Sequence, residues 1–449
     1  MKFGIVFLIT VLISCISYTQ DGVFNELSFK CSDGVDRPYI LYTPNTINKN
    51  NKRPLLTYLH GAISSKKLKK DPLVYIKKSP LLKLADKGGF YLLFCYGQKG
   101  ATWFDNIGVN MVINEVETVK KDYNIDKEKI FLSGFSDGGS GVMYIAMTKP
   151  NIFAGFISMN GHLRVAVQLG ESQVYPENMN DKPFFIINTK GDLLYPSKKL
   201  YPIIETIKSN NSNVKFTDID GNHDMSYLKY LDKDIIKFIE KNSKKKLYNI
   251  SWQCSKLTAN TIEWITIKKI DTSQIAKQWH TNYSLNLFED KADFGIKYDY
   301  KYQGKGLKIL GFKNNKSTAK KMKLKVGDIV YKMENDTIKN AYSPYYYMAK
   351  KKAGDKTSIT ALRDNKLLKF DGKFNKGYSY ELFKHKSKSA KVKANYRAKV
   401  ITIETSCVSE LAIDFNKLSI NSSKEIVVKI NNKSYRVIPK GIQTFSSIN

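Results

Sequence analysis

The sequence predicts an α/β fold for its first half, with a mostly parallel sheet covered by helices on both faces. Between residues 24 and 242, short apolar runs alternate with amphipathic stretches. Apolar side chains recur at helical spacing at Val109, Val112 and Val116. Uninterrupted apolar runs are typical of strands that are buried on both faces, as in parallel sheets. The predicted strands are 55–59, 90–96, 130–133, 155–159, 184–188 and 214–219, and the predicted helices are 109–123, 139–147 and 227–241.

The second half is predicted to be rich in β structure. A chain of 449 residues is too long for one ordinary domain. A polar, basic stretch at 242–246 marks a boundary, after which apolar and polar residues alternate as in strands. We expect the α/β domain at 24–242, a β-rich segment at 245–294, a separate unit at 295–376 and a β-rich C-terminal segment at 377–449, with a solvated Lys-, Ser- and Ala-rich connection at 385–399.

The chain is strongly basic, with 73 Lys and Arg against 41 Asp and Glu and a formal net charge of +32. Such a surplus attracts nucleic acids or anionic surfaces. The positive residues are mostly Lys, however, and they are spread along the chain without a nucleic-acid-binding motif. We therefore expect no nucleic-acid partner.

The first 19 residues are typical of an export signal. Lys2 precedes an apolar run at 3–14 that is too short to span a bilayer. Two kinds of processing fit this segment: cleavage after the small residues at 17–19, or lipidation of Cys15 in a lipobox. The predicted location is outside the cytoplasm, either secreted or periplasmic, or tethered as an outer-membrane lipoprotein. A lipid at Cys15 is the one membrane attachment that we expect.

Four cysteines follow the signal segment, at positions 31, 95, 254 and 407. Export permits disulfides, and a bridge between Cys254 and Cys407 is one alternative. Cys95 lies in an apolar strand and is predicted to be a buried free thiol.

The segment Gly134-Phe135-Ser136-Asp137-Gly138 predicts a nucleophile. It joins a predicted strand to a predicted helix, so Ser136 lies in a sharp turn that presents its hydroxyl at the edge of the sheet. The glycines leave room for the neighbouring strand and helix. The start of the following helix also favours developing negative charge.

A nucleophilic serine needs a base and an orienting acid. In this architecture the chain order is Ser, then Asp, then His. Asp192 follows the strand 184–188, and His223 follows the strand 214–219. Asp192 is therefore predicted to hold the imidazole of His223 in the tautomer that accepts the serine proton.

The oxyanion of the reaction needs N–H donors. We expect the amide of Asp137, next to the nucleophile, and the amide of Ala62 after the strand 55–59, with Ile63 as an alternative. His60 is expected to brace this loop.

Two further residues are candidates for the substrate pocket. Trp103 falls in the loop after the strand 90–96, where an aromatic residue either lines the pocket or belongs to the core. His162 follows the strand 155–159 and is expected at the pocket rim or as a satisfied histidine.

The residues 37–44, 54–61 and the Ser136 segment, with Asp192 and His223, resemble the secreted esterases related to polyhydroxybutyrate depolymerase and feruloyl esterase. Dienelactone-hydrolase-like and prolyl-oligopeptidase-like enzymes share much of this pattern. The resemblance covers about residues 24–242 and implies an α/β-hydrolase fold and a covalent acyl-enzyme.

The residues 304–310, 324–330 and 335–338 resemble a PDZ domain. The resemblance implies that an extended peptide adds to the edge of the sheet, although the loop departs from the usual Gly-Leu-Gly-Phe. A purely structural role is the alternative. The β-rich segments on either side are then two halves of one small β domain, into which this unit is inserted.

These patterns predict an exported serine hydrolase that cleaves carboxylic esters of the polymer, feruloyl or acetyl type, with a polymeric or plant-derived substrate as one expectation. A prolyl-oligopeptidase-like peptidase is one alternative. A catalytically silent binding protein that uses the PDZ-like unit is another. The sequence has neither a Cys/His cluster with zinc spacing nor a phosphate-binding glycine loop, and we expect no metal or organic cofactor.

Overall fold

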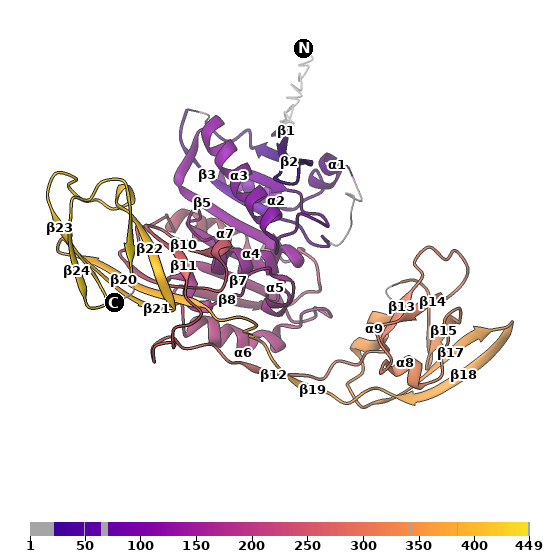
Figure 1. Cartoon of the computed structure of the whole chain (residues 1–449). Helices are drawn as coiled ribbons and strands as arrows, with labels where there is room; N and C mark the ends of the chain where they lie inside the picture. The colour runs from indigo at the N-terminus through magenta and orange to yellow at the C-terminus, as the bar shows by residue number, and fades with distance from the viewer. Residues whose placement is uncertain (1–21, 49, 64–70, 342, 384, 448–449) are drawn as a thin grey trace, which may run out of the picture.

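The computed structural model describes residues 22–48, 50–63, 71–341, 343–383 and 385–447. The signal segment 1–19 and Cys15 lie outside the described residues. The chain forms three parts: a central α/β domain, a β domain on one side of it and a smaller unit on the other side (Figure 1). None of the helices in the described ranges has the length and apolar character that crossing a membrane requires.

The α/β domain is built on an eight-stranded sheet in the order β1-β2-β4-β3-β5-β6-β7-β8. Neighbouring strands in the part of the sheet with the order β4-β3-β5-β6-β7-β8 are parallel. The strand β2, in contrast, is antiparallel to both β1 and β4. The sheet is therefore mostly parallel, as predicted, with an antiparallel hairpin at one edge that the sequence analysis did not predict. The strands are β1 Val23–Lys30, β2 Asp36–Thr43, β3 Arg53–Leu59, β4 Tyr91–Cys95, β5 Ile125–Phe135, β6 Gly155–Met159, β7 Phe184–Thr189 and β8 Val214–Ile219.

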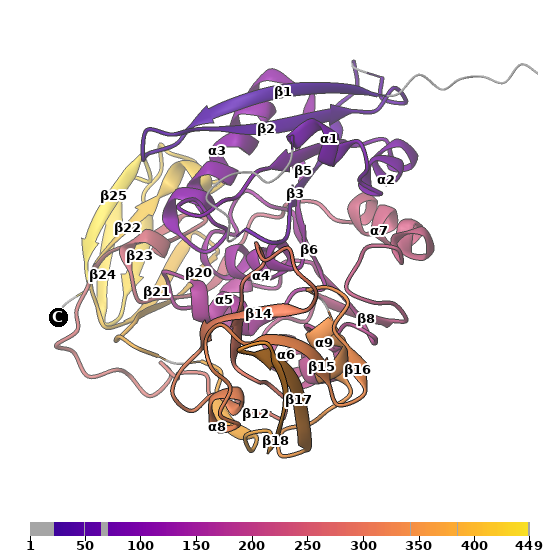
Figure 2. The ribbon, with the colours of Figure 1, turned by 90° about the vertical axis from the view of Figure 1, so that its right-hand side faces the viewer.

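Helices cover both faces of this sheet (Figure 2). The helices α3 to α6 pack on one face, and α1, α2 and α7 pack on the other, each set with its own apolar core. Strands apolar on both sides fill both cores, which is the pattern that predicted the layered fold. The helices are α1 Pro72–Ile76, α2 Leu81–Gly88, α3 Asn106–Asp122, α4 Asp137–Thr148, α5 Leu163–Leu169, α6 Ser197–Lys208 and α7 Leu228–Lys241, with a 3₁₀ turn at Pro176–Met179.

The β domain combines segments from both ends of the second half of the chain. The strand β9 pairs with β20, and β11 pairs with β22, so residues near 250–270 and 390–414 share two sheets and one core. The sheets have the orders β10-β11-β22-β25 and β24-β23-β21-β20-β9. Their strands are β9 Asn249–Cys254, β10 Thr261–Ile262, β11 Ile265–Ile270, β20 Ala390–Arg397, β21 Val400–Ser406, β22 Val408–Asp414, β23 Ile426–Ile430, β24 Lys433–Val437 and β25 Ile442–Ser446, with 3₁₀ turns at Leu257–Ala259 and Phe415–Lys417.

One prediction for this part of the chain is wrong, and one alternative, the disulfide, is not formed. The run 385–399 is not a simple solvated connection, because β20 lies within it and buries Ala390 and Val392 in the core of the β domain. Cys254 and Cys407 are both free and buried. Cys254 packs in that core, whereas the Sγ atom of Cys407 faces the carbonyl oxygen of Gln274 at 3.7 Å.

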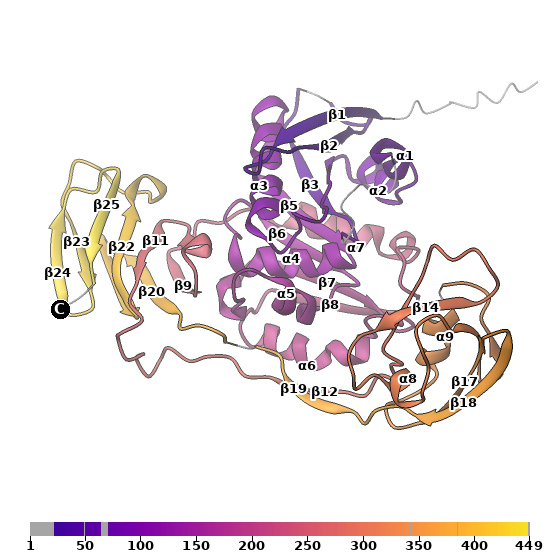
Figure 3. The ribbon, with the colours of Figure 1, turned by 45° about the vertical axis from the view of Figure 1, so that its right-hand side comes forward.

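The remaining unit, which we call the inserted unit, comprises residues 291–376. It has its own apolar core and is joined to the rest by the two-stranded ribbon β12–β19, which runs along α6 (Figure 3). Its likeness to a PDZ domain stays a prediction. The ribbon strands are β12 Asn286–Glu289 and β19 Tyr378–Glu381. The elements of the inserted unit are β13 Ile296–Tyr298, β14 Leu307–Phe312, α8 Thr318–Lys321, β15 Ile329–Met333, β16 Asp336–Thr337, α9 Ser343–Ala349, β17 Lys356–Arg363 and β18 Lys366–Lys373.

Candidate active site

Ser136 occupies the turn between β5 and α4. Its backbone has φ 59° and ψ −118°, a conformation that costs free energy for a residue with a side chain and that persists only when the surroundings impose it. Two glycines allow the turn to form. A methyl group on Gly134 would lie 2.4 Å from the carbonyl oxygen of Gly138, and one on Gly138 would lie 1.9 Å from the carbonyl oxygen of Leu59.

Ser136, His223 and Asp192 form one chain of hydrogen bonds. The Nε2 atom of His223 is 2.8 Å from the Oγ atom of Ser136, and its Nδ1 atom is 2.7 Å from Oδ2 of Asp192. Since an ionised carboxylate only accepts hydrogen bonds, Nδ1 carries the proton and Nε2 is left to accept from the serine hydroxyl. The structure thus brings together the three residues that the sequence singled out.

Asp192 is held by more than the histidine. Its Oδ1 atom accepts hydrogen bonds from the amides of Leu194 and Tyr195 at 2.8 and 2.9 Å, and Oδ2 also accepts one from Nδ2 of Asn160 at 2.8 Å. Burial raises the pKa of Asp192, but the hydrogen bonds from His223, Asn160 and the Tyr195 amide outweigh it and hold this pKa below its usual value. The carboxylate is therefore kept ionised and correctly oriented.

Asn160 is a site residue that the sequence analysis missed. It is fully buried, has φ 46° and accepts a hydrogen bond from the hydroxyl of Tyr227 at 2.9 Å. A signal was present, because Asn160 follows the end of β6 as Asp192 follows the end of β7. Polar residues at the carboxyl ends of neighbouring parallel strands gather at one edge of the sheet.

Two aromatic rings flank the imidazole of His223. Phe135 lies on it with 5.0 Å between ring centroids, and Tyr195 meets it edge-on at 5.8 Å. These contacts restrict the rotation of the imidazole about its side-chain bonds.

The predicted oxyanion donors, Ala62 and Asp137, lie beside Ser136. Ala62 has φ 58°, and a methyl group on the preceding Gly61 would lie 2.9 Å from Cβ of Ser136. Within the described ranges, neither the Ala62 amide nor the Asp137 amide donates to a protein acceptor. The alternative donor, the amide of Ile63, is occupied, because it donates to Oδ2 of Asp137 at 3.3 Å.

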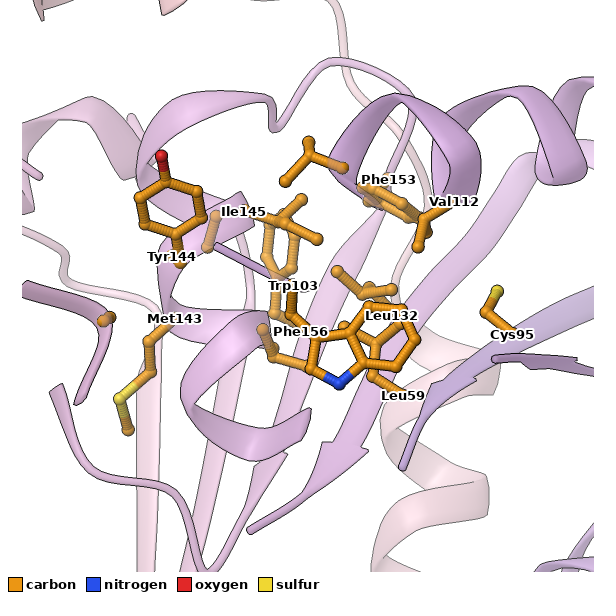
Figure 4. Close-up of a cluster of buried hydrophobic side chains, with 14 of the residues drawn as sticks. Leu59, Cys95, Trp103, Val112, Leu132, Met143, Tyr144, Ile145, Phe153 and Phe156 are labelled. Atoms are coloured by element: carbon orange, nitrogen blue, oxygen red, sulfur yellow. The ribbon is translucent and has the colours of Figure 1, made fainter. Parts of the chain in front are cut away.

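Trp103 does not line a pocket, so that prediction is corrected. Its side chain is fully buried among apolar residues, including Leu59 and Leu132 (Figure 4). Its indole Nε1 donates to the carbonyl oxygen of His60 at 2.9 Å, and the two rings meet edge-on at 5.4 Å. The indole is therefore fully buried and supports the loop that carries His60 and Ala62.

His162 lies beside the hydrogen-bonded chain of Ser136, His223 and Asp192 without joining it. Its Nδ1 atom accepts a hydrogen bond from the Arg164 amide at the start of α5, and its ring is 5.5 Å from that of Tyr195. Burial, with a smaller effect of Arg164, lowers the pKa of His162 to about 4. His162 also lines a cavity next to Tyr195, and its place at the rim of a substrate pocket stays a prediction.

The sheet order, with a strained serine between β5 and α4 and an acid and a histidine at the ends of β7 and β8, defines an α/β-hydrolase domain. Residues 98–243 match the model of the phospholipase/carboxylesterase family. The match supports a serine hydrolase that acts on carboxylic esters. The polyhydroxybutyrate depolymerase or feruloyl esterase type stays a prediction.

Individual proteins resemble parts of the chain. A bifunctional acetylxylan esterase/xylanase of Neocallimastix patriciarum is 30% identical over 136 residues, which are 30% of this chain and 19% of that protein. Acyl-protein thioesterase 1 of Neurospora crassa is 27% identical over 111 residues, or 25% of this chain and 45% of the relative. A solved fluorophosphonate-binding serine hydrolase of Staphylococcus aureus matches 49% of this chain and 98% of its own with 17% identity and a TM-score of 0.38. The chain thus spans less than half the length of these curated relatives.

Proposed function

We propose that this protein is a serine esterase that hydrolyses carboxylic esters through an acyl-enzyme on Ser136. The hydrogen-bonded chain from Asp192 through His223 to the strained Ser136 carries this proposal. The family match over residues 98–243 supports it.

In the first half of the reaction, Oγ of Ser136 attacks the ester carbonyl carbon while Nε2 of His223 takes the hydroxyl proton. The carbonyl oxygen becomes an oxyanion, which the amides of Ala62 and Asp137 stabilise. The carbon–alkoxy bond then breaks, and the imidazolium returns its proton to the leaving alcohol. Asp192 stabilises the transient positive charge on His223 without taking its proton.

In the second half, water replaces the alcohol. His223 takes a proton from the water as its oxygen attacks the acyl carbon, and the same two amides stabilise the second oxyanion. The bond to Ser136 breaks, the proton returns to Oγ, and the carboxylic acid leaves. The proton balance closes without a metal or cofactor.

Of the three ester types predicted from the sequence, we propose acetyl esters of a carbohydrate. The names of three of the curated relatives include acetylxylan esterase. A polymer or feruloyl ester has no comparable support among these relatives.

Purified protein with Ser136→Ala tests the proposal against the unaltered chain and against Ser226→Ala, an exposed serine on the loop of His223. We expect the parent and Ser226→Ala to hydrolyse p-nitrophenyl acetate and to be labelled by a fluorophosphonate. Ser136→Ala should lose the label and at least about 10³-fold of kcat. Retention of full activity by Ser136→Ala would sink the assignment.

A further inference from the structure

A cavity of about 540 Å³ lies where the α/β domain meets the inserted unit. One wall is formed by α5 and the segment 193–199, a second by the β12–β19 ribbon, and a third by the residues at the end of α9. Residues of the α/β domain, the ribbon and the inserted unit therefore line this cavity together.

This cavity adjoins the triad. Tyr195 lines it and also packs edge-on against the imidazole of His223, with ring centroids 5.8 Å apart. The backbone amide of the same Tyr195 donates to Asp192. One aromatic side chain, Tyr195, therefore contacts both the cavity and the imidazole of the proposed catalytic histidine.

Ion pairs hold the cavity walls together. Glu289 of β12 binds Arg164 at 2.7 Å and Lys199 at 3.0 Å, and Asp290 also binds Lys199. The guanidinium of Arg164 lies 4.2 Å from the ring centroid of Tyr380 in β19. These contacts join α5 and α6 to the ribbon and so hold two of the three walls of the cavity in place.

The lining has more positive than negative groups. The carboxylates of Glu289 and Asp290 are used by Arg164 and Lys199, as described above. In the described part of the chain, no carboxylate pairs with the ammonium groups of Lys198, Lys291 or Lys352, all three of which line the cavity.

Of these three lysines, Lys291 lies beside the segment that carries Asp192. Its Nζ atom donates to the carbonyl oxygen of Leu193 at 3.1 Å, one residue from Asp192. Burial lowers the pKa of Lys291, and the carboxylates of Glu289 and Asp293 offset this only in part. The neutral carbonyl of Leu193 does not supply the missing charge, so an anion in the cavity still stabilises this ammonium group.

We propose that this junction cavity is a substrate subsite that binds a carboxylate on the alcohol part of the ester, such as the carboxylate of an esterified acidic sugar. Lys198, Lys291 and Lys352 attract the carboxylate, and the ester bond lies at Ser136 on the far side of Tyr195. The inserted unit then has a defined role, since it supplies Lys352 and closes the wall opposite α5. This subsite rests on the proposed esterase function.

Acetylated oligogalacturonate and acetylated xylooligosaccharide, an acidic and a neutral substrate, test the subsite in the whole protein. The variant replaces Lys198, Lys291 and Lys352 with Gln. The control replaces three exposed lysines of the inserted unit that lie outside the cavity, Lys305, Lys366 and Lys376, and so changes the net charge equally.

We expect the cavity variant to lose roughly tenfold in kcat/KM on the acidic substrate, mainly through KM, because ion pairs at accessible sites each contribute modestly. The neutral substrate and the control variant should change less than about twofold. Added salt should narrow the difference between the two substrates in the parent protein. Equal losses on both substrates, or no preference of the parent for the acidic one, would contradict the subsite.

Binding separates the two proposals. Titration of Ser136→Ala with oligogalacturonate that carries no acetyl groups should show binding that the three cavity substitutions weaken. An active esterase without this binding refutes the subsite and leaves the proposed function standing. Binding without any ester hydrolysis by the parent protein does the reverse.

Discussion

Glu115 gives a quantitative test of how the α/β domain is packed. This residue of α3 is fully buried, and its carboxyl group lies beside the buried thiol of Cys95. Burial raises the pKa of Glu115 to about 8, and a hydrogen bond with the neighbouring thiol of Cys95 offsets this only in part. The side chain is therefore mostly neutral in the folded protein at pH 7, but it ionises freely when the chain unfolds.

The sign of the pH dependence follows from proton binding. Between the unfolded pKa near 4.5 and the folded pKa near 8, the folded state holds a proton that the unfolded state has lost, so the free energy of unfolding falls as pH rises. At 1.36 kcal/mol per pH unit, Glu115 costs about 1 kcal/mol at pH 5 and about 3 kcal/mol at pH 7. The cost reaches its full value above pH 8 and disappears below pH 4.

Glu115→Gln removes the ionisation and keeps the shape of the neutral acid. The difference in free energy of unfolding between the variant and the parent should therefore increase by about 2 kcal/mol from pH 5 to pH 7, in favour of the variant. Urea unfolding at both pH values, followed by hydrogen exchange in the peptides of α3 and β4, measures this domain separately from the two β-rich units. Glu117→Gln is the matched control, because Glu117 lies on the same helix with a side chain that is 43% exposed.

A constant difference between Glu115→Gln and the parent across this pH range would refute the reasoning. It would mean that Glu115 ionises in the folded protein at its ordinary pKa. A pH-dependent gain in Glu117→Gln would show instead that the effect comes from the general charge of the helix.

Three further predictions concern the site itself. Gly138→Ala should unfold or inactivate the α/β domain, because the new methyl group meets the Leu59 carbonyl oxygen at 1.9 Å; thermal unfolding and fluorophosphonate labelling measure this, and a stable, active variant would contradict it. Asn160→Ala should lower kcat about tenfold or more with little change in KM, because Asp192 loses a buried hydrogen bond worth about 1–3 kcal/mol; an unchanged kcat would show that the backbone amides suffice. Asp137→Ala should lower kcat, because it removes the carboxylate that accepts a hydrogen bond from the Ile63 amide and so anchors the loop of Ala62. Asp137→Asn keeps an acceptor oxygen and should retain most activity, and equal kcat values for the two variants would refute this anchoring.

The local parts of the site were predictable because they depend on neighbours in the chain. A strand, a tight turn with glycines and a helix follow one another around Ser136, so the elbow is visible in five consecutive residues. Asp192 and His223 each follow an apolar strand, and parallel strands bring their carboxyl ends to one edge. Asn160 also follows an apolar strand, but the sequence analysis missed it because an amide after a strand is less conspicuous than an acid or a histidine.

Other features depend on which surfaces meet, and the sequence does not encode these in any short pattern. Trp103 is equally compatible with a pocket wall and a core until the His60 loop covers it. A disulfide between Cys254 and Cys407 was one alternative from the sequence, but the β domain places their side chains in separate environments. The pairing of β9 with β20 joins residues about 140 positions apart, and the basic cavity exists only where two domains and their ribbon come together.

By itself, then, the sequence determined the layered α/β fold and the three residues of the Ser136 hydrogen-bonded chain, because hydrophobic periodicity and turn chemistry act over a few residues. The tertiary structure decided the burial of Trp103, the support of Asp192 by Asn160, the free thiols and the junction cavity. Burial and electrostatic environment are properties of contacts between distant segments, and only folding brings those segments together.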